Sequence, residues 1–202
     1  MVLSNVDIVK ALKNGAFKIE GLEYSEPSEK PFNTSAVDLR LGNEVTVPFS
    51  DVPVQLDLRK GNIAKLWAMH SKQITITEDQ PFVLKQNQFV LANTFEKVSF
   101  PLTPDAQCYS ARVEGKSSLA RCGVLIHFTA PTIHSGWYGP ITLEMMNLGP
   151  MEFLLFPKMY ICQLIVEEVS GCPADAPNQF KGQKSPAGQV TPKSAETRAS
   201  EK

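Results

Sequence analysis

Apolar and polar residues alternate along most of this chain, and this period of two predicts strands rather than helices. Val37, Leu39 and Leu41 alternate with charged neighbours, and Ile74 and Ile76 alternate with threonines. Alternation or short apolar runs predict further strands over residues 82–84, 89–92, 98–100, 107–113, 124–128, 141–146, 153–156 and 160–166. Pro or Gly separates many of these segments, without long helical patterns between them. The pattern therefore predicts a mainly β fold, either an antiparallel or mixed sandwich or a distorted barrel.

A helical pattern is present near the start of the chain. Ser4 with Asp7 three residues later is typical of a helix N-cap, and Asn14-Gly15 is typical of a helix end. Residues 53–72 fit an extended loop, a short helix or a subunit contact, and the pattern does not choose between them. From residue 171 onward large apolar residues almost vanish, which predicts a flexible tail. We therefore expect one β domain over residues 1–170, including the helix, and a tail over residues 171–202 that can order over a ligand.

Composition narrows the class of function. The 202 residues are 43% hydrophobic, which is enough for the core of one domain. With 20 Lys and Arg against 21 Asp and Glu, the chain has no general basic field, so a free nucleotide fits better than a nucleic acid polymer. The sequence shows neither a signal peptide nor a run of membrane-spanning length, so we expect a soluble, cytoplasmic protein without membrane contact.

The segment Lys116-Ser117-Ser118 combines a cation, two hydroxyls and successive backbone N–H groups, a combination that can bind phosphates. Residues 119–121, ending in Arg121, fit the start of a short helical turn. The alternative is an ordinary solvated turn rich in serine with two surface cations. The residues alone leave both interpretations open.

Glu144 stands alone in the apolar run of residues 141–146. On a strand with apolar flanks, desolvation raises a carboxyl pKa toward neutrality, whereas a nearby cation such as Arg121 lowers it. A carboxyl with such a pKa can transfer protons near neutral pH. The alternatives are a Glu on the polar face of a half-exposed strand, and an Arg121 that forms only a surface ion pair.

Taken in order, residues 111–121, His127 to Ala130, residues 136–139 and residues 141–144 resemble the dCTP deaminase family. Asp7-Ile8, residues 37–43 and residues 180–183 also fall where that family has similar residues, so the resemblance covers most of the chain. The family shares its fold with the trimeric dUTPases. The resemblance therefore implies a dUTPase-like distorted β-barrel, or β-clip, that assembles as a homotrimer with sites between subunits.

The resemblance also implies an activity, the hydrolytic deamination of dCTP to dUTP and ammonia. The catalytic residues that the resemblance implies are Glu144 for proton transfer, and Ser117 and Arg121 for positioning water and the carboxylate. The implied nucleotide-binding residues include these three together with Lys116, Ser118, Phe128, Ala130, His134, Thr142, Leu143 and Gln183. The zinc motif of other deaminases, His-x-Glu followed by Pro-Cys-x-x-Cys, is absent from the sequence. We therefore expect no catalytic metal or cofactor, with Mg²⁺ bound only through the substrate triphosphate.

The chain departs from the family pattern just before Gly136. Relatives commonly have Ile-Asp-Pro-Gly there, and this chain has Ile133-His134-Ser135-Gly136. In dUTPases and bifunctional deaminases that aspartate prepares water for attack on phosphorus, so we expect little or no diphosphohydrolase activity here. Two alternatives stay open: a dUTPase or bifunctional deaminase and diphosphohydrolase, or a nucleotide-binding relative without turnover. Residues 136–139 are expected to form a hairpin turn, with Trp137 either against a deoxyribose or in the core.

Overall fold

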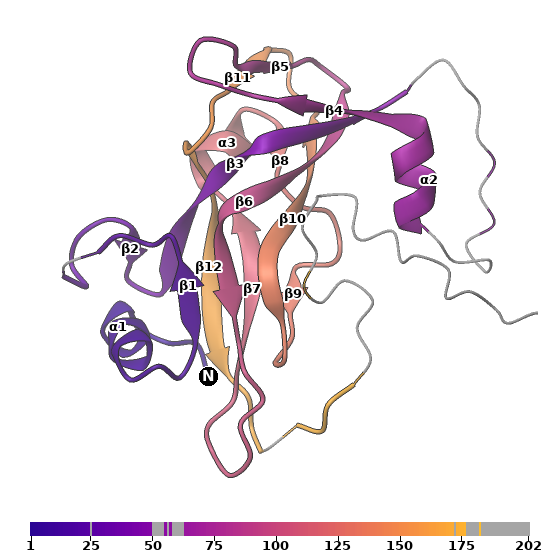
Figure 1. The fold of residues 1–202 in the computed structure, drawn as a ribbon. Coiled ribbons are helices and arrows are strands. Elements are labelled where there is room, and N and C mark those ends of the chain that lie inside the picture. Colours follow the sequence, from indigo (N-terminus) through magenta and orange to yellow (C-terminus); the bar gives the residue numbers. More distant parts are fainter. Residues whose placement is uncertain are drawn as a thin grey trace, which may run out of the picture.

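The computed structural model describes residues 1–24, 26–49, 55, 57, 63–171, 173–176 and 182. Helices and strands alternate unevenly along the chain (Figure 1), and strands predominate. Their bounds are α1 Asn5–Lys13, β1 Lys18–Glu20, β2 Phe32–Asn33, β3 Ala36–Pro48, α2 Ile63–His70, β4 Ser71–Thr75, β5 Phe82–Leu84, β6 Phe89–Ser99, β7 Tyr109–Gly115, α3 Ser117–Arg121, β8 Val124–Leu125, β9 Thr132–Ile133, β10 Tyr138–Asn147, β11 Phe153–Leu155 and β12 Tyr160–Glu168. The predicted mainly β class is confirmed.

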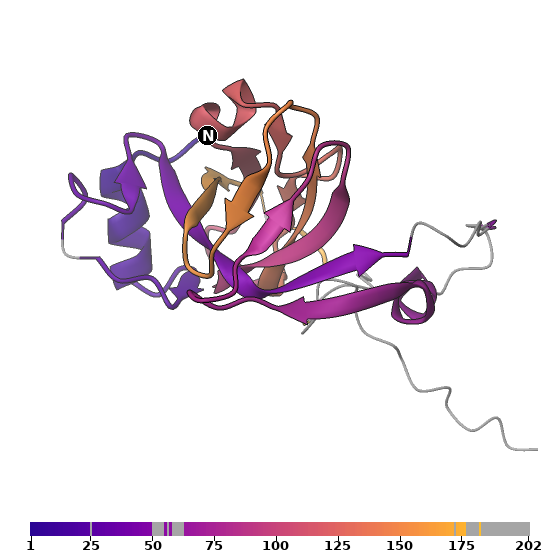
Figure 2. The ribbon, with the colours of Figure 1, turned by 90° about the horizontal axis from the view of Figure 1, so that it is seen from above.

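One antiparallel sheet forms the body of the described chain, and its main path runs β8-β10-β6-β3-β12-β7-β9. The long strand β3 joins the two halves of this sheet. Its first half pairs with β12, as in Val37 opposite Leu164, and its second half pairs with β6 and β4, as in Thr46 opposite Leu91 and Gln73. The sheet curls around the apolar core, with α1 on one side and α2 at the far end of the β3–β4 arm (Figure 2).

The N-terminal helix forms as its capping pattern predicts. The Ser4 hydroxyl accepts a hydrogen bond from the Asp7 backbone N–H and donates one to the Asp7 carboxylate. Asn14 caps the other end, and Gly15 follows with a φ of 70°, a conformation that glycine adopts with little strain. The helix places Ile8 and Val9 in the core.

The strand predictions differ most from the structure at two places. Residues 89–92, 98 and 99 belong to one strand, β6, because the polar side chains of Thr94 and Glu96 face the interior and form hydrogen bonds there, and Phe100 lies just beyond the end of this strand. The strand predicted over residues 124–128 ends at Leu125, because its ladder with β10 ends at the pair Leu125 and Met146. Apolar pattern alone does not report where backbone pairing stops.

The predicted hairpin turn at residues 136–139 is also wrong. Tyr138 and Gly139 already belong to β10, and the turn lies earlier, closed by the Trp137 N–H donating to the His134 carbonyl. This turn does not link paired strands, because the preceding strand β9 pairs with β7 and not with β10. The Trp137 side chain is buried in the core, which agrees with the simpler of its two interpretations.

Two further segments are described only in part, residues 53–72 and the tail. Part of the unassigned segment, residues 53–72, forms helix α2, and none of the described helices is long and apolar enough to cross a membrane. Most of the predicted tail lies outside the described residues. Of it, residues 171, 173–176 and 182 are described, and the Gly182 N–H donates to the Tyr138 carbonyl at 2.8 Å. The division into residues 1–170 and a flexible tail stays a prediction.

Candidate active site

Glu144 lies in the middle of β10 on the face turned away from the core. Its neighbours Leu143 and Met145 are fully buried, whereas the Glu144 side chain is half-buried. Directly across the ladder stands Leu91 of β6, which is itself 6% exposed. Burial raises the pKa of the Glu144 carboxyl above its ordinary value, and nearby backbone N–H groups and His127 lower it in part. The structure thus places a desolvated carboxyl where the sequence predicts a proton-transfer group.

The stretch of residues 127–128 follows β8 and runs beside Glu144. The Phe128 backbone N–H and the His127 side chain are both close enough to favour the charged form of the Glu144 carboxyl. The Phe128 ring is 43% exposed and packs edge-on against Phe89, with ring centroids 5.7 Å apart. His127 is mostly buried, and its Nδ1 has no hydrogen-bond partner in the described part of the chain. Glu144 and Phe128 therefore border the same patch of surface.

The predicted phosphate-binding turn forms helix α3. The side chains of Ser117, Ser118 and Arg121 are exposed to solvent. Lys116 precedes the helix, and its ammonium lies 2.6 Å from the Asp38 carboxylate of β3. The turn is therefore open to a ligand while its first residue is held by the sheet.

Asp38 is a site residue that the sequence analysis did not single out. Its carboxylate is almost fully buried, and besides Lys116 it accepts hydrogen bonds from Asn33 at 2.9 Å and Gln163 at 3.1 Å. A buried carboxylate needs such partners, since an unpaired charge is costly in the interior. The alternation of residues 37–41 offered the available signal, because it places Asp38 between core residues on a strand.

Glu144 and α3 are not joined within one chain. Among the described residues no hydrogen bond or ion pair connects the Glu144 carboxyl with Ser117 or Arg121, so the predicted partnership of Arg121 with Glu144 is not found in a single protomer. The reason is topological: α3 precedes β8, which pairs with the far end of β10 at Met146 and Asn147. Antiparallel pairing at that end leaves Glu144 beside residues 127–128 instead.

The remaining predicted binding residues differ in how exposed their side chains are. Ala130 and His134 are exposed, Thr142 is partly exposed on the face of Glu144, and the Leu143 side chain is in the core. A buried side chain cannot touch a ligand on the outer face, so Leu143 can offer only its backbone. Gln183 lies outside the described residues. No group of three or more His, Cys, Asp or Glu side chains that could hold a metal ion occurs within the described ranges.

Comparison with known proteins shows the family of this chain. A family model described as dCTP deaminase-like matches residues 2–169. The chain belongs to this family. It is 35% identical over 182 residues to the dUMP-forming dCTP deaminase of Methanosphaera stadtmanae, covering 87% of this chain and 83% of that relative. It is also 35% identical over 198 residues to the dCTP deaminase of Thermomicrobium roseum, covering 96% and 92%.

The fold of this dCTP deaminase-like chain is shared with a solved structure. The 2′-deoxycytidine 5′-triphosphate deaminase from Agrobacterium tumefaciens superposes with a TM-score of 0.61 at 16% sequence identity. The match covers 84% of this chain and 48% of that one, so this chain spans about half the length of that protein. This likeness supports the family fold.

Proposed function

We propose that this chain hydrolyses dCTP to dUTP and ammonia, with Glu144 as the group that transfers protons. The observation that carries the proposal is the position of this carboxyl, half-buried opposite Leu91 with a raised pKa, beside the exposed Phe128. Relatives named dCTP deaminases at 35% identity support the choice of substrate. Because dCTP is an intracellular nucleotide, we also propose that the protein works in the cytoplasm.

One carboxyl can serve each proton transfer of this reaction. Water attacks C4 of the cytosine ring, and Glu144 takes a proton from that water and delivers it to N3. The new C–O bond leaves a tetrahedral carbon, from which Glu144 then transfers the second water-derived proton to the amino group. The C–N bond breaks, ammonia leaves, and the ring keeps a carbonyl oxygen at C4. The raised pKa suits this role, since the group must both accept and release a proton near neutral pH.

The other predicted residues supply binding in this proposal. Backbone groups of residues 128–130 and 142–143 are proposed to pair with the edge of the base, and Gln183 with the tail of the nucleotide. Ser118 and Lys116 bind phosphate oxygens, since a lysine ammonium has three donors and can bind phosphate while it stays on Asp38. Mg²⁺ arrives chelated by the triphosphate, and no cofactor is needed for the chemistry.

A homotrimer would complete the site. We propose that Ser117 and Arg121 of one protomer reach Glu144 of its neighbour, since the two parts are unconnected within a chain. Light scattering after gel filtration is expected to give the mass of three chains of 22.3 kDa each. A monomer that releases ammonia at full rate would contradict this assembly.

The products distinguish this proposal from its bifunctional alternative. We expect one ammonia per dCTP consumed and no pyrophosphate, because the exposed His134 occupies the position where related diphosphohydrolases have an aspartate. The assay follows ammonia and pyrophosphate with dCTP and with dUTP, and His134→Asp serves as the matched variant. Pyrophosphate released by the unmodified protein in step with ammonia would instead make it dUMP-forming, as the Methanosphaera stadtmanae relative is named.

A further inference from the structure

Strand β6 contains a bulge directly upstream of the Glu144 pairing. Pro140 of β10 stands opposite Lys97, and Thr142 stands opposite Asn93. Between these two pairs β10 advances by two residues and β6 by four, so residues 94–96 together face the single residue Ile141. Such a bulge shifts the register of every pair that follows it.

The shift decides what lies beside Glu144. Regular pairing continued from Pro140 and Lys97 would set Glu144 opposite the amide side chain of Asn93, whereas the bulge sets it opposite Leu91. Directly opposed side chains are the nearest neighbours across a ladder. The carboxyl therefore borders a buried apolar side chain instead of a polar one.

The hydroxyl of Thr94 closes the bulge. It accepts a hydrogen bond from the Ile141 N–H at 3.0 Å and donates one to the Glu96 carbonyl at 2.7 Å. Thr94 and Ile141 are only 2% and 3% exposed, so water cannot readily take the place of this hydroxyl. The side chain supplies the acceptor that the bulged backbone of β6 does not present to Ile141.

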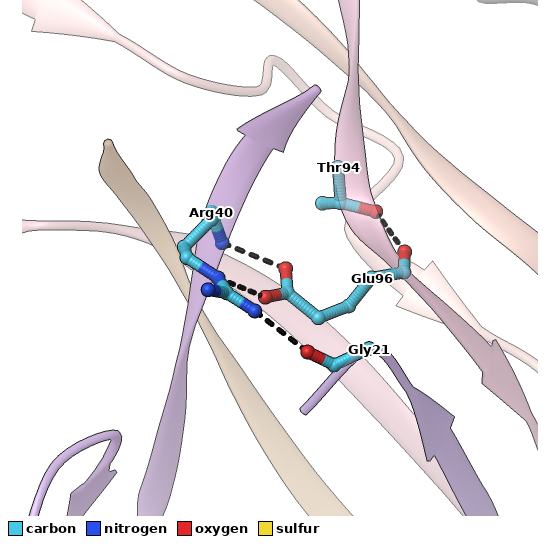
Figure 3. Close-up of polar contacts among 4 residues, drawn as sticks. All are labelled: Gly21, Arg40, Thr94 and Glu96. Carbon is cyan, nitrogen blue, oxygen red and sulfur yellow. Dashed lines mark hydrogen bonds and ion pairs between the residues drawn. The ribbon is translucent and has the colours of Figure 1, made fainter. Parts of the chain in front are cut away.

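The other two bulge residues, Glu96 and Phe95, also have partners, and Figure 3 shows those of Glu96. Arg40 donates to the Glu96 carboxylate from its backbone N–H at 2.8 Å and from Nε at 2.6 Å, and its Nη2 donates to the Gly21 carbonyl at 2.6 Å. Phe95, on the outer side, has the Arg40 guanidinium 4.8 Å from its ring centroid and the Lys158 ammonium 5.0 Å from it. Each residue of the bulge thus has a defined partner.

We infer that Thr94 is a positioning residue for deamination, whose hydroxyl closes the β6 bulge and so sets Glu144 opposite Leu91. The inference rests on the proposed function of Glu144. Thr94 faces the interior, and this inference assigns it no contact with the substrate or the reacting atoms. Its effect passes through the Ile141 backbone to the carboxyl three residues further along β10.

The test compares Thr94→Val, which keeps the shape and removes the hydroxyl, with Thr94→Ser, which keeps the hydroxyl. Thr94→Val is expected to lower kcat for ammonia release by about 100-fold with little change in KM, the scale of loss from a small misplacement of a catalytic group. Thr94→Ser is expected to restore most of the rate. Thr46→Val is the matched control, because Thr46 is also a buried sheet threonine, and its hydroxyl has no hydrogen bond among the described residues.

A second measurement separates this inference from the proposed function. Hydrogen exchange at the Ile141 amide is expected to become about tenfold faster in Thr94→Val, whether or not dCTP is the substrate. If the unmodified protein releases no ammonia, the proposed function fails and this exchange measurement alone decides the role of Thr94. Where Thr94→Val does not fold, the smaller Thr94→Ala replaces it under the same criteria.

Several results would overturn the inference. These are unchanged exchange at Ile141, a Thr94→Val enzyme with the normal kcat, and a Thr94→Ser enzyme as slow as Thr94→Val. An equal loss in Thr46→Val would also overturn it, because any buried threonine would then have the same effect.

Discussion

Glu144→Gln is expected to lower kcat for ammonia release from dCTP by about 10²- to 10⁴-fold, the range typical for loss of a general acid–base group. Glutamine keeps the length of the side chain and an oxygen that can accept hydrogen bonds, but it cannot carry a proton from water to the ring. Steady-state ammonia release measures the effect. Glu20→Gln, at an exposed position of β1, is the control and is expected to retain the normal rate.

The same substitution is expected to stabilise the protein at neutral pH. Because burial raises the pKa of Glu144, the folded state holds its proton more tightly than the unfolded state does. As pH rises from the ordinary glutamate pKa to the raised one, the native protein loses stability, and Glu144→Gln escapes this loss. Above the raised pKa, urea unfolding should therefore give a higher free energy of unfolding for Glu144→Gln than for the unmodified protein. Below the ordinary pKa, the two proteins should have the same free energy of unfolding. A gain in the free energy of unfolding that is independent of pH would contradict the explanation by desolvation. In the ammonia assay, a Glu144→Gln rate equal to that of the unmodified protein would exclude Glu144 from catalysis.

Arg40→Ala is expected to cause the largest loss of stability, about 3–5 kcal/mol in the free energy of unfolding, as when one partner of a buried ion pair is removed. The Glu96 carboxylate is fully buried, and in the variant it would lose the hydrogen bond from the Arg40 Nε. Of the two donors that residue 40 offers it, only the backbone N–H would remain. Since domains are commonly stable by about 5–15 kcal/mol, such a loss is a large share of the total. Urea denaturation followed by circular dichroism measures it.

Arg112→Ala provides the matched control for that loss. Arg112 also forms an ion pair across the sheet, with Glu167, but both side chains are about one-third exposed. Exposed pairs contribute about 0–1 kcal/mol, so this variant should unfold near the denaturant concentration of the unmodified protein. If Arg40→Ala and Arg112→Ala lost the same free energy of unfolding, burial of Glu96 would not be what makes the loss of Arg40 costly.

Several elements could be predicted because their signals are local. The Ser4 cap and the apolar spacing after it specify helix α1, and alternation specifies most strands, since side-chain direction follows directly from the backbone period. The order of short motifs also identified Glu144 and the turn of residues 116–121, and the family that they resemble is the one to which the chain belongs.

Other features could not be predicted because they depend on partners distant along the chain. Thr94 and Glu96 interrupt an apolar pattern, so the pattern divides β6, whereas buried hydrogen bonds to Ile141 and Arg40 keep the strand continuous. The neighbours of Lys116 in the sequence indicate a phosphate ligand. Its contact with Asp38, on a strand far earlier in the chain, depends on the fold.

The sequence by itself determined the β class, the N-terminal helix, the family and the presence of a lone glutamate in an apolar strand, since each depends on residue types at short spacing. Only the tertiary structure decided that Glu144 faces Leu91 rather than Asn93, that Asp38 holds Lys116, and that α3 and Glu144 are unconnected within a protomer. The physical reason is that register, burial and ion pairing are set between strands, and a single chain's local pattern does not specify which strand will lie opposite.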